Sequence, residues 1–184
     1  VDTDGKVRRA EPIAVEHGPS IHDCAITANH VVVMDLPVTF SLDAMGQGYR
    51  FPYRWNPAHE ARIGLLPREG KGGDIVWHDI DPCYAFHPCN AHEVEDVAVV
   101  MDIVVHDKLF DDSYFGPDGS KTAFERWVIP ADGGKVERSV TDASGQEFPR
   151  FDERLTGQPY RYAYCTALAD GGAGFISETR LYKH

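Results

Sequence analysis

Short apolar or alternating runs, separated by Gly, Pro, Asp and Asn, recur along the whole chain, and helical periodicity is scarce. This pattern is typical of an all-β protein without long helices. The predicted strands fall into three sets in chain order. They are 21–27, 30–36, 61–66 and 74–79, then 83–87, 96–105, 124–129 and 135–140, and finally 147–151, 160–167 and 174–182.

The first two sets repeat one another. The run VVVMDL at residues 31–36 corresponds to AVVMDI at 98–103, and RIGLL at 62–66 corresponds to RWVI at 126–129. Four antiparallel strands that recur about every 65 residues are typical of the blades of a β-propeller. We therefore predict part of a propeller, with the long loops at 41–60 and 107–123 left to carry specific chemistry.

The predicted blade units lie at about residues 20–80, 81–141 and 147–184, as parts of one partial propeller domain. A propeller needs about four blades to close its ring, and this chain supplies two units and part of a third. It also begins at Val1 rather than Met. Together these features predict an internal piece of a longer protein, and a processed N-terminus is the alternative.

The composition is that of a folded domain, with 184 residues, 42% hydrophobic and 26% charged. A net charge of -11 without any basic cluster argues against nucleic acid as a partner. The sequence contains no apolar run long enough for a transmembrane segment. Its 4 cysteines form no CxxC pair, so we expect buried reduced thiols and a cytoplasmic protein.

A histidine heads each of the two repeats, His22 in SIHDC and His87 in AFHPC. The first strand of each propeller blade lines the central axis, so both side chains would point toward it and converge on one metal ion. A ligating imidazole is neutral and is oriented by an acceptor on its other nitrogen. Glu147, at the start of the third set, would serve, although a surface Glu is the alternative.

A buried core histidine is the alternative for His22 or His87 taken singly, but the repeat relationship favours a shared site. The other seven histidines lie in loops or at strand ends and are predicted to be solvated. They are His17, His30, His59, His78, His92, His106 and His184.

Several ordered motifs resemble those of the carotenoid cleavage oxygenase family, and the bacterial lignostilbene dioxygenase branch fits best. IHDCAIT at residues 21–27 is similar to the HDFAIT segment of the family, and FHPCNA at 86–91 is similar to its FHPxNA segment. EFPR at 147–150 and GQPYRYAY at 157–164 resemble its EFP and GRPYRYxY segments.

This resemblance implies a seven-bladed propeller with one Fe(II) held by four histidines. His22 and His87 would be two of these ligands, the other two would lie outside the chain, and Glu147 would accept a hydrogen bond from a ligand, His87. The implied reaction splits one C=C bond with O2 to give two carbonyl products. Phe86 would line the apolar tunnel for the substrate, or else pack in the core.

The protein is thus predicted to be a non-haem iron dioxygenase acting on a hydrophobic, conjugated apocarotenoid or stilbene-type molecule. Residues 1–184 alone are expected to bind iron weakly and to be inactive, because two ligands do not fix the geometry of a four-ligand site. The alternatives are a noncatalytic propeller that serves as a binding module and a metal-dependent polyene isomerase that uses the same site.

Overall fold

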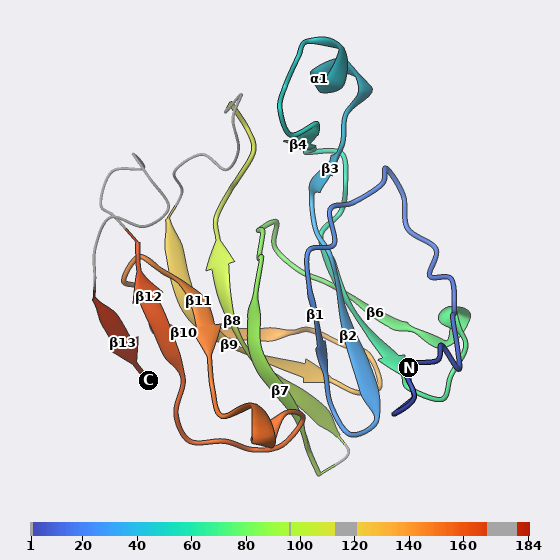
Figure 1. Cartoon of the computed structure of the whole chain (residues 1–184), viewed down its shortest axis with the longest axis vertical. Helices are drawn as coiled ribbons and strands as arrows, with labels where there is room; N and C mark the ends of the chain where they lie inside the picture. The colour runs from blue at the N-terminus through green and yellow to red at the C-terminus, as the bar shows by residue number, and fades with distance from the viewer. Residues whose placement is uncertain (1, 96, 113–120, 169–179) are drawn as a thin grey trace.

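The computed structural model describes residues 2–95, 97–112, 121–168 and 180–184. These residues form antiparallel sheets arranged side by side, with little helix (Figure 1), which confirms the predicted all-β class. In the described part of the chain no helix is long and apolar enough to cross a membrane. The helical elements are α1 (Leu42–Gly46), η1 (Gly72–Asp74) and η2 (Glu153–Leu155).

The first sheet has the strand order β1-β2-β5-β6. Its central strand β2 is rich in Val, which suits a strand buried between neighbours. Met34 pairs with Ile63, and Asp35 pairs with Arg62. The strands are β1 (Cys24–Ile26), β2 (His30–Asp35), β5 (Arg62–Pro67) and β6 (Val76–Asp79).

The second sheet has the equivalent order β7-β8-β9-β10. Met101 pairs with Trp127, and Asp102 pairs with Arg126, so a methionine and an aspartate–arginine pair occupy the same positions as in the first sheet. The internal repeat expected from the sequence is thereby confirmed. The strands are β7 (Pro88–Val94), β8 (Ala98–His106), β9 (Thr122–Pro130) and β10 (Glu137–Asp142).

The third sheet has the order β11-β12-β13, and a separate hairpin, β3-β4, carries α1 away from the sheets (Figure 1). This hairpin and helix occupy much of the region predicted as a loop at 41–60. Residues 174–179 of the last predicted strand lie outside the described residues. The strands are β3 (Val38–Phe40), β4 (Tyr53–Trp55), β11 (Gln146–Arg150), β12 (Tyr164–Ala167) and β13 (Leu181–Lys183).

The predicted strand at 83–87 is wrong. The first strand of the second sheet begins at Pro88 instead, where a residue without a backbone N–H is tolerated. Residues 83–87 approach it and make only one isolated bridge, between Tyr84 and His106. The first strand of the first sheet likewise begins at Cys24 and not at residue 21.

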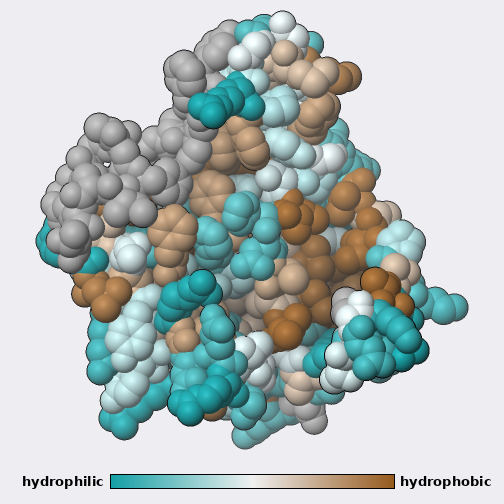
Figure 2. Space-filling model, viewed as in Figure 1, coloured by the Kyte–Doolittle hydropathy of each residue, from teal (hydrophilic) through white to brown (hydrophobic). Residues whose placement is uncertain are grey.

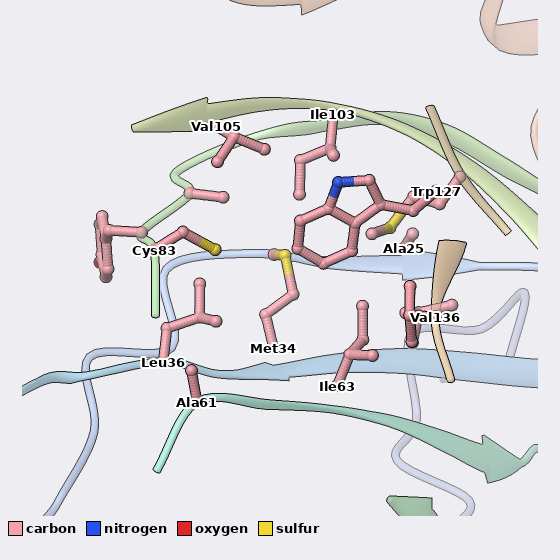
Figure 3. Packing of buried hydrophobic residues seen from close by; sticks show 14 of the residues in the cluster. Ala25, Met34, Leu36, Ala61, Ile63, Cys83, Ile103, Val105, Trp127 and Val136 are labelled. Atoms are coloured by element: carbon pink, nitrogen blue, oxygen red, sulfur yellow. The ribbon is translucent and has the colours of Figure 1, made fainter. Parts of the chain in front are cut away.

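The main hydrophobic core lies between the first two sheets (Figure 3). The indole of Trp127 from β9 is fully buried and lies between Ile103 of β8 and the side chains of Met34 and Ile63 from the first sheet. Burial of one such aromatic side chain stabilises the fold by about 1.5–3 kcal/mol. The two repeats are therefore packed against each other and hold their first strands in fixed positions.

Two apolar side chains at β1 and in the segment before it are exposed. Ile21 and Ile26 are 42% and 41% exposed, and Figure 2 shows apolar side chains gathered over this part of the surface. Because alternate residues of a strand face opposite sides, buried Ala25 and exposed Ile26 mark the inner and outer faces of β1.

Candidate metal centre

The first strands of the three sheets, β1, β7 and β11, lie beside one another and line a groove of about 680 Å3. His87 contributes to this groove, together with Asp23, Asn90, Phe148 and Arg150. These side chains come from the first strands of three sheets or from the residues just before them, at positions about 60 residues apart in sequence. The packing of the sheets therefore brings groups that carry chemistry to one place.

The structure brings His22 and His87 together. His22 lies shortly before β1, and His87 directly precedes β7. Their ring centroids are 5.0 Å apart, and the rings are nearly perpendicular at 88°. His22 is exposed and the side chain of His87 is 27% exposed, so neither is enclosed in the core. Their role as metal ligands stays a prediction.

Glu147 is fully buried on β11 and accepts three hydrogen bonds. The donors are His87 Nδ1 to Oε2 at 2.9 Å, His106 Nε2 to Oε1 at 2.9 Å, and the Phe148 backbone N–H to Oε2 at 2.5 Å. Burial opposes ionisation, but the bonds from His106, His87 and Phe148 outweigh it and lower the pKa of Glu147. A surface Glu, the alternative considered above, is therefore wrong.

This carboxylate determines the tautomer of His87. An ionised carboxylate only accepts hydrogen bonds, so the proton of neutral His87 lies on Nδ1, and Nε2 carries the lone pair. A metal-ligating imidazole has this arrangement, in which the other nitrogen donates to a carboxylate. The donor set thus fits a divalent transition metal, for which neutral imidazole is a suitable ligand.

A local distortion of β11 positions both Glu147 and its neighbour. Phe148 has a φ of 55°, in the left-handed region that is uncommon for a bulky residue, and the strand register shifts between Glu147 and Arg150. This bulge keeps Glu147 pointing inward and places the Phe148 ring against His87, with centroids 5.3 Å apart. The strain is thus located at the candidate site.

Phe86 is only 8% exposed and belongs to the main core cluster. Its ring makes edge contacts with His22 at 5.1 Å and with His106 at 5.4 Å. It therefore packs beside the histidines from within the core. Its predicted role in lining a substrate tunnel stays a prediction.

His106 is the functional-site residue that sequence reasoning missed. The prediction of a solvated side chain is wrong, because His106 is 2% exposed and donates to Glu147. His106 is the last residue of β8 and follows a long apolar run. That position in the sequence could have indicated that its side chain is buried. The same prediction is also wrong for His59 and His78, which are 6% and 2% exposed.

The cysteines are free thiols, and three of them, Cys83, Cys89 and Cys165, are buried as expected. Cys24 is exposed, so the expectation of burial is wrong for this residue. Burial raises the pKa of Cys83 and Cys89 to about 11 and that of Cys165 to about 12, which keeps all three protonated near neutral pH.

Across residues 2–95, 97–112, 121–168 and 180–184, no group of three or more His, Cys, Asp or Glu side chains is arranged to hold a metal ion. His22 and His87 therefore form a pair without a third such ligand in the described part of the chain. Two neutral imidazoles, of which His87 has its tautomer fixed by Glu147, could form part of a larger set of metal ligands.

All 184 residues match the sequence model of the retinal pigment epithelial membrane protein family. A carotenoid cleavage oxygenase from Mycobacterium tuberculosis is 37% identical over 228 residues, with 100% of this chain and 46% of that protein covered. An isoeugenol monooxygenase from Pseudomonas putida is 32% identical over 172 residues, with 89% and 36% covered. The chain thus spans less than half the length of these relatives.

Solved structures show the same fold. Lignostilbene dioxygenase from Pseudomonas brassicacearum superposes with a TM-score of 0.77 at 24% identity, covering 91% of this chain and 37% of that one. Cobalt-substituted apocarotenoid oxygenase from Synechocystis superposes with a TM-score of 0.70 at 26% identity, covering 90% and 36%. The sheets are therefore part of a β-propeller. The chain belongs to the retinal pigment epithelial membrane protein family, the family of the carotenoid cleavage oxygenases that its motifs resemble.

Proposed function

We propose that the protein containing this chain is a non-haem Fe(II) dioxygenase that cleaves a conjugated C=C bond of an apocarotenoid or stilbene-type substrate to carbonyl products. The observation that carries the proposal is the pairing of His22 with His87, 5.0 Å apart, above a buried Glu147 that fixes the tautomer of His87. Membership of the family and the similarity to oxygenases that act on such molecules support it.

In this proposal His22 and His87 are two of four histidine ligands, with the other two outside the chain. The similarity to a cobalt-substituted relative supports a resident metal ion. When bound, Fe(II) supplies an open coordination position at which O2 is activated beside the substrate. Residues 1–184 alone are expected to bind iron weakly and to be inactive, because a half set of ligands does not fix the geometry.

The remaining residues position these ligands. Glu147 holds the proton of His87 on Nδ1 and is itself held by His106, so that the imidazole ring cannot rotate freely. Phe148 packs its ring against His87, and Phe86 packs its ring against His22 from the core side. We also propose that Phe86 lines the apolar tunnel, so that Phe86→Leu would raise KM more than it lowers kcat.

We further propose that the three sheets correspond to blade units at residues 20–80, 81–141 and 147–184 of a single domain. The aspartate–arginine pair that the first two sheets share supports this division. The exposed side chains of Ile21 and Ile26, at and before β1, are consistent with coverage by a further part of the complete propeller.

The test uses the protein containing this chain, loaded with Fe(II) without oxygen and then assayed for iron content and for carbonyl products. We expect His87→Ala to lose both, and Glu147→Gln to weaken iron binding or activity by about 10–100-fold. His92→Ala, on the same strand as His87 but outside the cluster around Glu147, is the matched control.

Two results would contradict the proposal. Iron content that is unaffected by His22→Ala and His87→Ala would leave a noncatalytic binding module as the better interpretation. An isomerised substrate without carbonyl products would favour the isomerase instead.

A further inference from the structure

A second pair of histidines lies outside the cluster around Glu147. His17 Nδ1 and His59 Nδ1 are 3.1 Å apart, their ring centroids are separated by 5.3 Å, and the rings are inclined by 72°. His59 is 6% exposed, whereas His17 is exposed and covers it from the solvent side. The proposed dioxygenase function uses neither residue.

Asp35 fixes the tautomer of His59. This carboxylate is fully buried at the end of β2 and accepts from His59 Nε2 at 2.8 Å and from Arg62 Nε at 2.8 Å. Because a carboxylate only accepts, the proton of neutral His59 lies on Nε2. Its Nδ1 lone pair therefore points toward His17. The arrangement of carboxylate and imidazole is the one that orients metal-binding histidines.

The backbone that follows His17 is anchored to strand β3. The Phe40 N–H donates to the Gly18 carbonyl at 2.9 Å, and the Ser20 N–H donates to the Val38 carbonyl at 2.8 Å. These bonds hold the segment that follows His17, whose own φ of 58° lies in the left-handed region. Holding the ligand backbones before an ion arrives lowers the entropic cost of binding.

The turn that carries His59 is bound to the same strand and to the residue before it. The Asn56 N–H donates to the Pro37 carbonyl at 2.8 Å, and the His59 N–H donates to the Asn56 carbonyl at 3.0 Å. Asn56 Nδ2 also donates to Thr39 Oγ1 at 3.2 Å. Both imidazoles are thus presented from segments tied to one hairpin.

We propose that His17 and His59 form a binding site for a divalent d-block cation such as Zn2+, with Asp35 as the group that orients His59. Two imidazole nitrogens on one tetrahedral zinc ion lie about 3.3 Å apart, since each Zn–N bond is about 2.0–2.1 Å. The observed 3.1 Å separation differs from this value by only about 0.2 Å. Water would fill the remaining positions on the exposed side.

Charge near the pair favours a cation over an anion. Glu16 and Glu60 directly adjoin the two histidines in sequence, and both are exposed. The chain as a whole carries a formal net charge of -11. A bound ion would cross-link the segment before β1 to the turn before β5, and so stabilise the first sheet.

The test is a titration of the protein with Zn2+ alone, followed by NMR of the imidazole nitrogens and by calorimetry. We expect the ring signals of His17 and His59 to shift together, and His17→Ala to weaken this binding step at least tenfold while the iron content stays unchanged. His92→Ala is the matched control and should bind Zn2+ like the unmodified protein.

A second experiment uses a variant without the two proposed iron ligands, because these could also bind Zn2+. In a His22→Ala, His87→Ala background the step that depends on His17 should persist, so that a failure of the dioxygenase proposal does not affect this result. Two results would overturn the proposal: Zn2+ that shifts the imidazole signals of His22 and His87 alone, or a Zn2+ affinity that His17→Ala does not change. The His17–His59 pair would then be an ordinary hydrogen bond. The NMR arm on the unmodified protein decides the question even if the double variant fails to fold.

Discussion

Asp35 in the first sheet and Asp102 in the second are equivalent residues with different third partners. Each is buried at the same place in the repeat and is paired across the sheet with an arginine, Arg62 or Arg126. Asp35 also accepts from His59, which comes from its own unit. Asp102 instead accepts at 2.6 Å from the hydroxyl of Tyr160, which lies in the connection between β11 and β12 of the third sheet.

The two aspartates show which interactions are common to both copies of the repeat and which are specific to one copy. The pairing of aspartate with arginine is common to both, so we attribute it to the stability of the unit itself. The third partner decides what the carboxylate connects. In the first sheet it connects a loop to its own sheet and orients the His17–His59 pair, and in the second it links one sheet to the next.

The largest expected effect comes from removing the shared carboxylate. Asp35→Ala should lower the free energy of unfolding by about 3–5 kcal/mol, because it leaves Arg62 and buried His59 without their acceptor. Asp102→Ala should cost less, about 2–3 kcal/mol, because Arg126 is 52% exposed and can regain water. Urea unfolding of both variants measures the difference, and a larger loss for Asp102→Ala would contradict this ranking by burial.

Removal of the third partner alone should have a smaller effect. Tyr160→Phe deletes only the hydroxyl that reaches Asp102, and a hydrogen bond to a charged group contributes about 1.5–3 kcal/mol. Tyr162→Phe is the control, because this ring is 41% exposed, and it should change stability by less than about 0.5 kcal/mol. A double-mutant cycle with Asp102→Ala should show strong coupling for Tyr160 and none for Tyr162.

The first and second sheets are linked by a different carboxylate, Glu93 on β7. It accepts from Thr27 Oγ1 at 2.5 Å, the Asn29 N–H at 2.9 Å and His30 Nδ1 at 3.1 Å. Burial opposes ionisation, but the bonds from Thr27, Asn29 and His30 outweigh it and lower the pKa of Glu93. This link between sheets therefore depends on pH, whereas the hydroxyl of Tyr160 does not titrate near neutral pH.

Glu93→Gln should lower stability by about 1–2 kcal/mol at neutral pH. A carboxyl whose pKa is lowered in the folded state stabilises it fully above the unfolded value of about 4.3 and loses this contribution as the pH falls through the folded value. The difference between variant and unmodified protein should therefore shrink in acid. Urea unfolding from pH 7 to pH 3 checks this, with exposed Glu95→Gln as the control, and a constant difference would contradict it.

The sequence predicted the features that depend on local pattern. Strand periodicity and the repeated VVVMDL and AVVMDI runs were sufficient for the all-β class and for the equivalence of the first two sheets. The repeat also predicted that His22 and His87 would meet, and the structure places them together. These inferences succeeded because short apolar runs and their repetition are properties of the local sequence.

Features that depend on packing between distant segments were not predictable. His106 and Glu147 are 41 residues apart, and their contact exists only because β8 and β11 pack together. Phe148 adopts a left-handed φ that its residue type disfavours, so local propensity argues against the bulge that the structure contains. The His17–His59 pair likewise needs β3, which has no strong strand pattern and was predicted as neither strand nor helix.

The smallest effect should come from replacing each arginine of the shared pair by lysine. Arg126 donates two bonds to Asp102, at 2.8 and 2.9 Å, but is 52% exposed. Arg62 donates one bond to Asp35, is 27% exposed, and stacks on Trp77 at 4.1 Å. We expect Arg126→Lys to cost about 0.5 kcal/mol and Arg62→Lys about 1 kcal/mol, since stacking and burial favour a guanidinium. Urea unfolding at low and high salt compares the two variants. If Arg126→Lys costs more, the paired geometry of its two bonds outweighs burial, and the two copies of the repeat differ in their shared pair as well as in their third partner.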